Sequence, residues 1–391
     1  MSARQEAGFH EVDVNGWPAV ASAIVLGTIG VLSFIIQPGL VEGFVRHLAV
    51  SEAQAVNLVG LEMLGVALAT VGLALLGGRI GWRWVVAAGL LMAAAGDAAS
   101  ALSTGSAGFA PARVLAGLGE GVIISISFTF VGITLRAERN LALYLSLLLT
   151  YGAFGLWFLP RFLDAYGLPV LFAGFAGLSL AALLLLPLLP HRFSAADMAN
   201  PEARQLPLAL LVVALAGVLS YNLAQGIAWA ILALVGAGAG LADQQIANAL
   251  FLSQILAIFG ALTSVFLAAR INRDHAIAFG ILVGAASIAL LVGHPGVGLF
   301  TLAVCGFNVL WNFVLPFILG RICDFDESGR IMGFAIAMQM TGLGGGPMLA
   351  ALLLDGHGYL PVELLCVGLF LASYALLRLP IRRHRGLLAR G

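Results

Sequence analysis

The sequence predicts an all-α membrane protein with twelve transmembrane helices in two pseudo-symmetric bundles of six. Composition is the first reason: 61% of the 391 residues are hydrophobic and 10% are charged, whereas a soluble protein carries roughly a quarter charged residues. The second reason is that apolar runs of about 20 residues, the length of a membrane span, recur from end to end. These runs are continuous rather than alternating, which favours helices over a membrane β-barrel.

The spans follow one another from a polar start. The first 16 residues are polar, and the apolar run after them is too long for the core of a signal peptide. We therefore interpret this run as the first span. The predicted spans cover residues 18–43, 53–76, 84–102, 108–133, 141–163, 168–190, 207–235, 245–269, 275–293, 297–320, 330–354 and 361–379.

A polar stretch at residues 191–206 divides the chain into an N-terminal half, 1–190, and a C-terminal half, 207–391. Several features recur at an offset of about 191 residues, for example Thr150 and Thr341. A common offset over distant segments indicates a duplicated unit of six spans. Paired repeats that meet at a central path are the usual construction of secondary transporters.

Arginine placement predicts the orientation. Arginines fall in alternate loops and near both ends of the chain, whereas other loops, such as 103–111 and 294–298, are nearly free of them. Because basic loops stay in the cytoplasm, we expect both termini on the cytoplasmic side of a cell (inner) membrane. The arginines behind this assignment are Arg4, Arg79, Arg83, Arg136, Arg139, Arg192, Arg204, Arg270, Arg273, Arg321, Arg330, Arg378, Arg382, Arg383, Arg385 and Arg390.

The fourth span carries an arginine and a carboxylate, Arg113 and Glu120, with glycines at 117, 119 and 121. Seven residues make nearly two helical turns, so the two charges share a face about 10 Å apart. Ionisable groups at membrane depth are costly and mark functional sites by default. Burial and the arginine act in opposite directions on the ionisation of Glu120, which suits it to gain and lose a proton. The alternative is an internal tie between helices.

Two further ionisable residues lie inside predicted spans. Glu62, in the second span, is interpreted as a second proton site or a partner of Arg113, with a purely structural role as the alternative. Asp97 lies near the outer end of the third span, where a structural or snorkelling role is favoured.

Twelve spans in two halves, together with two motifs, resemble the major facilitator superfamily. The loop after the second span keeps Arg79, Gly81 and Arg83 of the family's gating motif, but Gly78 replaces its acid. The fourth-span motif, an arginine followed by three spaced glycines, is matched in full. With Glu120 added, it resembles the organic anion:proton symporter branch, which implies proton coupling by Glu120 with Arg113 organising it.

The resemblance also implies that the first, fourth, seventh and tenth spans surround the solute path. Amides with aromatic rings on those spans suit an uncharged or aromatic part of a small ligand. Arg113 is the candidate for the solute's carboxylate, and hydrogen bonding between helices is the alternative use of the amides. The other candidates for solute binding are Gln37, Tyr151, Tyr221, Asn222, Gln225, Asn308, Trp311, Asn312 and Gln339.

These features favour a proton-coupled symporter of a small organic anion, with aromatic anions among the candidates. The alternatives are a proton-driven antiporter that exports drugs or metabolites, and a non-transporting membrane sensor or lipid-binding protein. The net charge of zero gives no sign of nucleic-acid binding. No catalytic, cofactor or metal-binding pattern is visible, so we expect a monomeric non-enzyme without cofactors. Its expected partners are a small organic solute, protons and the lipid bilayer.

Overall fold

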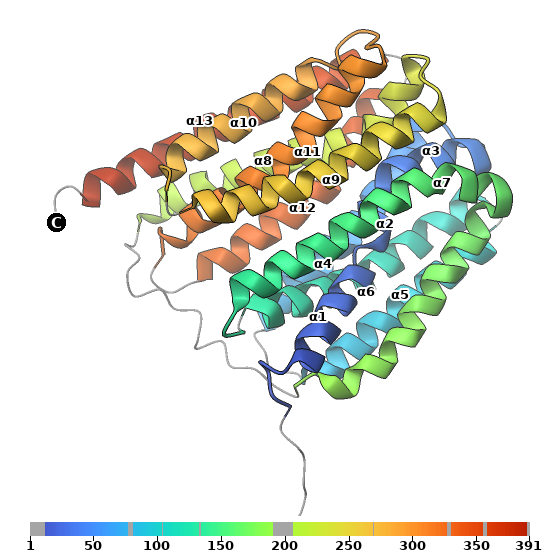
Figure 1. Cartoon of the computed structure of the whole chain (residues 1–391), viewed down its shortest axis with the longest axis horizontal. Helices are drawn as coiled ribbons and strands as arrows, with labels where there is room; N and C mark the ends of the chain where they lie inside the picture. The colour runs from blue at the N-terminus through green and yellow to red at the C-terminus, as the bar shows by residue number, and fades with distance from the viewer. Residues whose placement is uncertain are drawn as a thin grey trace, which may run out of the picture.

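Long apolar helices packed side by side make up the molecule (Figure 1). The computed structural model describes residues 12–76, 81–103, 105–132, 134–190, 206–268, 270–326, 330–354 and 358–388, and every regular element within them is helical. Within these described residues, nine stretches are long and apolar enough to cross a membrane, and one of them, Arg139–Leu188, has 50 residues and holds two passes. The chain is a multi-pass helical membrane protein, as the composition predicts.

The N-terminal bundle contains the first six passes, drawn from blue to green in Figure 1. Its elements are α1 (Trp17–Ile29), α2 (Leu32–Ile35), α3 (Gln37–His47), α4 (Glu52–Leu76), α5 (Trp82–Leu102), α6 (Ser106–Gly132), α7 (Ala137–Ala182) and the 3-10 helix η1 (Leu183–Leu188).

The first pass is broken, whereas the sequence predicts one continuous span over 18–43. The α-helix stops at Ile29, resumes for the four residues of α2, and starts again as α3 with Pro38 in its first turn. Proline lacks the backbone N–H that would continue the helical bonding of the preceding turn. The break leaves backbone carbonyl groups in the middle of the bundle that need other donors.

The fifth and sixth passes are two helices, both within the range labelled α7, that meet at a turn at Gly167. This residue has φ 74° and ψ 174°, a conformation open to glycine at little cost. In Figure 1 the chain crosses the bundle, turns and returns beside α5. The predicted spans 141–163 and 168–190 therefore lie on either side of this turn.

The C-terminal bundle contains the other six passes, drawn from yellow-green to red in Figure 1. Its helices are α8 (Leu208–Gly238), α9 (Asp243–Leu267), α10 (Arg273–Ala289), α11 (Val297–Cys323), α12 (Arg330–Leu354) and α13 (Leu360–Leu388).

The bundles meet chiefly where α4 packs on α12, α7 on α9, and α3 on α8. Glycine permits the first of these contacts: a Cβ on Gly344 of α12 would lie 2.8 Å from the backbone of Met63 on α4. The glycine-rich run of α12 thus provides close packing, as the sequence suggests.

We call the side where α1 begins and α13 ends the terminal face, and the side where α3 ends and α4 begins the opposite face. Two predicted loops, 77–80 and most of the 191–206 linker, lie outside the described residues. The division into halves at that linker and the cytoplasmic placement of the terminal face stay predictions.

Candidate functional site: a buried ion cluster and a neighbouring aromatic–amide cluster

Arg113 on α6 is the centre of a buried ion cluster with three carboxylates. Its Nη2 lies 2.9 Å from Glu62 Oε1, and its Nε donates to Glu62 Oε2 at 3.1 Å. Its Nη1 donates to Asp97 Oδ1 at 2.9 Å, and Glu120 Oε1 lies 3.9 Å from Nη2. The four side chains come from α4, α5 and α6, and the arginine is 0% exposed.

Neutral groups complete the surroundings of the guanidinium. Ser100 Oγ accepts a hydrogen bond from Nη1 at 3.2 Å, and Ser33 Oγ accepts one from Nη2 at 3.4 Å. The ring of Phe172 covers one face, with its centroid 4.5 Å from Cζ, a distance suited to a cation–π contact. Each guanidinium nitrogen of Arg113 therefore has a polar partner inside the N-terminal bundle.

Charge in the cluster is unbalanced when all four groups are ionised, because three carboxylates surround one guanidinium. An uncompensated buried charge is expensive, and such a group tends to neutralise instead. Among the described residues, Glu120 Oε2 has no hydrogen-bond partner. The cluster is therefore suited to hold a proton that can leave when the surroundings change.

Glycines on α6 allow the close approach of α4 that this cluster needs. A Cβ on Gly117 would lie 1.9 Å from Glu62 O, and one on Gly121 would lie 2.5 Å from Val66 O. On the other side of α6, a Cβ on Gly119 would lie 2.3 Å from Ala93 N of α5. The spaced glycines of the fourth-span motif thus bring the backbones of α4 and α5 within reach of Arg113.

The broken first pass connects the ion cluster to the C-terminal bundle through α2. Tyr151 on α7 donates its hydroxyl hydrogen to Leu32 O at 3.0 Å. Trp229 on α8 donates its indole hydrogen to Phe34 O at 2.8 Å. These two side chains supply donors to carbonyl groups at the break, where the regular helical bonding is interrupted. Ser33, between them, is the partner of Arg113.

Aromatic rings and amides form a second cluster, in the C-terminal bundle against α2. Trp311 lies 6.1 Å from the ring of Phe34 and 6.0 Å from that of Trp229, both nearly edge to face. Asn308 donates to Gln254 Oε1 at 2.8 Å, and Asn312 donates to Asn308 O at 3.0 Å. We call these six residues the aromatic–amide cluster.

One amide of this cluster reaches the junction of the bundles. A Cβ on Gly152 of α7 would lie 2.3 Å from Gln254 Nε2 and 2.4 Å from Ile35 Cγ2. That nitrogen is buried and has no hydrogen-bond partner among the described residues. A buried donor without a partner is costly. Gln254 Nε2 can therefore donate a hydrogen bond to a ligand or a water molecule at this place.

The remaining predicted binding residues lie apart from this cluster or have few polar contacts. Tyr221 packs on Phe370 of α13, with ring centroids 5.6 Å apart, and accepts a hydrogen bond from Gln225 at 2.5 Å. Asn222 donates to Val218 O on its own helix. It packs against Gly342 of α12, where an added Cβ would lie only 2.6 Å from the Cβ of Asn222. These contacts favour the alternative that Tyr221 and Asn222 serve helix packing.

Two other predicted residues lie in different surroundings. Gln37, at the start of α3, is buried, and neither of its amide atoms has a partner among the described residues. Gln339 on α12 is half-buried. Of the predicted gating motif, Arg79 lies outside the described residues, Gly81 precedes α5, and Arg83 donates to Leu189 O at 2.6 Å.

Sequence reasoning missed part of the ion cluster. We expected Asp97 to have a structural or snorkelling role, but it does not snorkel, because its side chain turns inward and pairs with Arg113. Ser33, Ser100 and Phe172 carried no signal, because each comes from a different helix. One signal for Asp97 was available: it is one of three carboxylates well inside the predicted spans of the N-terminal half, which contain a single arginine at membrane depth.

Solved structures of major facilitator transporters share this arrangement of helices. The human organic anion transporter MFSD10 (TETRAN) matches with a TM-score of 0.65 and 18% sequence identity, over 92% of this chain and 99% of MFSD10. The chain has the major facilitator fold. FucP, a transporter of the Major Facilitator Superfamily solved in the outward conformation, matches with a TM-score of 0.63 and 18% identity, over 94% of this chain and 99% of FucP. No protein-family model and no curated protein matches the sequence.

Each cluster includes side chains from passes that the resemblance assigned to a solute path. The passes that hold Ser33, Arg113, Trp229 and Trp311 are the first, fourth, seventh and tenth, which are the passes that the resemblance places around the solute path. The matches to MFSD10 and FucP confirm the predicted fold, and the role of these residues in a solute path stays a prediction.

Proposed function

We propose that this protein is a secondary active transporter that couples the movement of a small organic anion to protons, by symport. The single observation that supports coupling most directly is the ratio of three carboxylates to one guanidinium in the fully buried Arg113 cluster. A proton on Glu120 reduces the excess negative charge of the cluster, and loss of that proton restores the excess. Such a group biases an equilibrium between conformations when they hold the proton with different affinity.

The aromatic–amide cluster is the proposed solute site. Edge-to-face rings offer an apolar surface, and Asn312 and Gln254 offer amide groups beside it. Arg113 has no exposed surface and no free donor nitrogen in this conformation. We therefore assign it the organisation of the proton site rather than direct contact with the solute.

Communication between the two sites is assigned to α2. Its Ser33 contacts Arg113, and its Phe34 contacts both Trp229 and Trp311. A change of charge in the ion cluster alters the contact of Ser33 with Arg113. Because Phe34 is the next residue of the four-residue helix α2, its contacts with Trp229 and Trp311 change as well. An organic anion as the solute agrees with the fourth-span motif and with MFSD10, a structural neighbour that is an organic anion transporter.

The test is uptake of a panel of organic acids into proteoliposomes with the outside more acidic than the lumen. Symport predicts that the proton gradient drives accumulation of the solute and that the lumen becomes more acidic as solute enters. Glu120→Gln carries no titratable proton, so we expect it to lose gradient-driven accumulation while it still exchanges labelled for unlabelled solute.

Glu363→Gln is the matched control, because Glu363 is a buried carboxylate on α13 outside the ion cluster. We expect this variant to accumulate solute as the wild type does. Normal gradient-driven accumulation by Glu120→Gln would refute the coupling assignment. Protons leaving the lumen as solute enters would instead indicate antiport, the alternative mechanism.

A further inference from the structure

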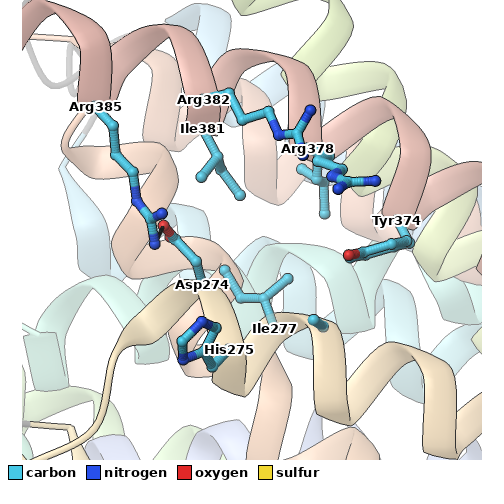
Figure 2. A pocket seen from close by; sticks show the side chains of 10 residues that line it. Asp274, His275, Ile277, Tyr374, Arg378, Ile381, Arg382 and Arg385 are labelled. Carbon is cyan, nitrogen blue, oxygen red and sulfur yellow. Dashed lines mark ion pairs between the residues drawn. The ribbon is translucent and has the colours of Figure 1, made fainter.

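A cavity of about 250 Å³, lined by charged and apolar side chains, lies between α10 and α13, near the terminal face and away from both clusters (Figure 2). Helix α10 contributes Asp274 and His275 to its lining. Helix α13 contributes Tyr374, Arg378, Arg382 and Arg385, which follow one another at helical spacing along one side of the helix. Neither the proposed proton site nor the proposed solute site uses these residues.

Positive charge is in excess in this cavity. Its single carboxylate, Asp274, is already paired with Arg385, the ion pair that Figure 2 marks. Arg321 of α11 also donates to Asp274 Oδ1, at 2.5 Å from Nη2 and 3.0 Å from Nε. No described carboxylate pairs with Arg378 or Arg382, and Arg378 only approaches the ring of Tyr374, at 5.9 Å. Two guanidinium groups are therefore available to an anion.

Exposed apolar side chains follow the cavity lining toward the middle of both helices. Leu371, three residues before Tyr374 on α13, and Phe279, four residues after His275 on α10, expose 48% and 56% of their surface. A second cavity, of about 480 Å³, adjoins the first through His275 and is lined by apolar side chains that include Phe279 and Phe313. Basic groups thus meet exposed apolar surface at the end of two membrane-spanning helices.

We propose that this cavity binds the phosphate headgroup of an anionic phospholipid, with the acyl chains along the exposed leucine and phenylalanine side chains. Arginine pairs with phosphate through two parallel hydrogen bonds, and basic pockets between spanning helices suit anionic headgroups. A free phosphate ion shares the headgroup chemistry but gains nothing from the apolar surface, which is why we commit to a lipid. This site is independent of the proposed transport function.

Native mass spectrometry of the detergent-purified full chain tests the proposal. The probes are phosphatidylglycerol and phosphatidylcholine with identical acyl chains, added at equal concentrations. We expect bound phosphatidylglycerol to exceed bound phosphatidylcholine, and Arg378→Gln/Arg382→Gln to remove this preference with at least a roughly tenfold loss of the anionic lipid. Both arginines are exposed, so the double variant is expected to fold, as size-exclusion chromatography will verify.

Arg383→Gln is the matched control, because Arg383 is exposed on the same helix but does not line the cavity. It should keep the preference for phosphatidylglycerol. An equal loss in this control would mean that general surface charge attracts the lipid, and an unchanged double variant would mean that the cavity does not bind it. Calorimetric titration with inorganic phosphate separates the two sources: phosphate binding as tight as that of phosphatidylglycerol would overturn the lipid assignment.

Discussion

At the scale of single residues, Arg113 stands out because the protein uses all of its hydrogen-bonding capacity internally. Glu62, Asp97, Ser100 and Ser33 accept from its three nitrogens. A guanidinium can serve this many partners because its donors point outward in a fixed planar fork. The carboxylates depend on it in turn, since it is the cation that pairs with each of them.

Replacing Arg113 by glutamine should therefore leave three buried carboxylates without their cation. Removing one partner of a buried ion pair costs about 3–5 kcal/mol, so we expect a lower unfolding temperature in detergent than for the wild type. Lowering the pH should reduce the difference in unfolding temperature between the variant and the wild type, because protonated carboxyl groups need no cation. Thermal unfolding measured across pH provides the check, with Arg139→Gln, an arginine in no described ion pair, as the control. An Arg113→Gln variant equally unstable at every pH would contradict this explanation.

At the scale of helices, the fourth-span glycines are required by backbone contact rather than by flexibility. Gly117→Ala should push α6 away from α4, because the new Cβ would overlap Glu62 O. Overpacking of this kind costs about 1–3 kcal/mol or more. Gly132→Ala is the control on the same helix, since a Cβ there has nothing within 4 Å.

Fluorescence-detected size-exclusion chromatography after heating reports the folded fraction of both glycine variants. We expect Gly117→Ala to lose its monodisperse peak at a lower temperature and Gly132→Ala to keep that of the wild type. Equal stability of the two variants would show that α4 can withdraw without cost.

Periodicity in the sequence predicted most helices and part of the site. Hydrophobic runs located the spans, and the seven-residue spacing placed Arg113 and Glu120 on one face of α6, where both now lie in one cluster. The pairing with Asp97 could not be predicted, because it depends on the height at which α5 crosses α6. The break at α2 was missed because residues 30–36 are apolar apart from Gly30 and Ser33, and one serine does not interrupt the hydropathy of the run.

At the scale of the whole molecule, polar contacts tie the two bundles together at the opposite face. Arg46 at the end of α3 donates to both carboxylate oxygens of Asp243 at the start of α9, at 2.5 Å for the Nη1 contact. Tyr359, just before α13, donates to Glu52 at the start of α4, at 2.8 Å. At the terminal face, the ion pair of Arg273 with Asp324 joins helices of the same bundle instead. The conformation described here is therefore closed at the opposite face.

Breaking the Arg46–Asp243 pair should favour opening of that face. The two side chains are 42% and 38% exposed, and exposed pairs contribute about 1 kcal/mol or less, so Asp243→Asn should shift the population between closed and open by up to about fivefold. Spin labels at His47→Cys and Asn248→Cys, both exposed and on different bundles, report the separation. The three native cysteines are free and would be replaced first.

The distance distribution should gain a longer component in Asp243→Asn and remain unchanged in Asp324→Asn, which removes two ion pairs within one bundle. Exchanging the charges, with Arg46→Asp and Asp243→Arg together, should recover the short distance, because the attraction across the bundles is restored. A longer component that persists in this double variant would assign the closed state to packing of α4 on α12 rather than to charge. Since secondary transport requires both faces to open in turn, a pair worth about 1 kcal/mol is strong enough to bias the closed state and weak enough to break in each cycle.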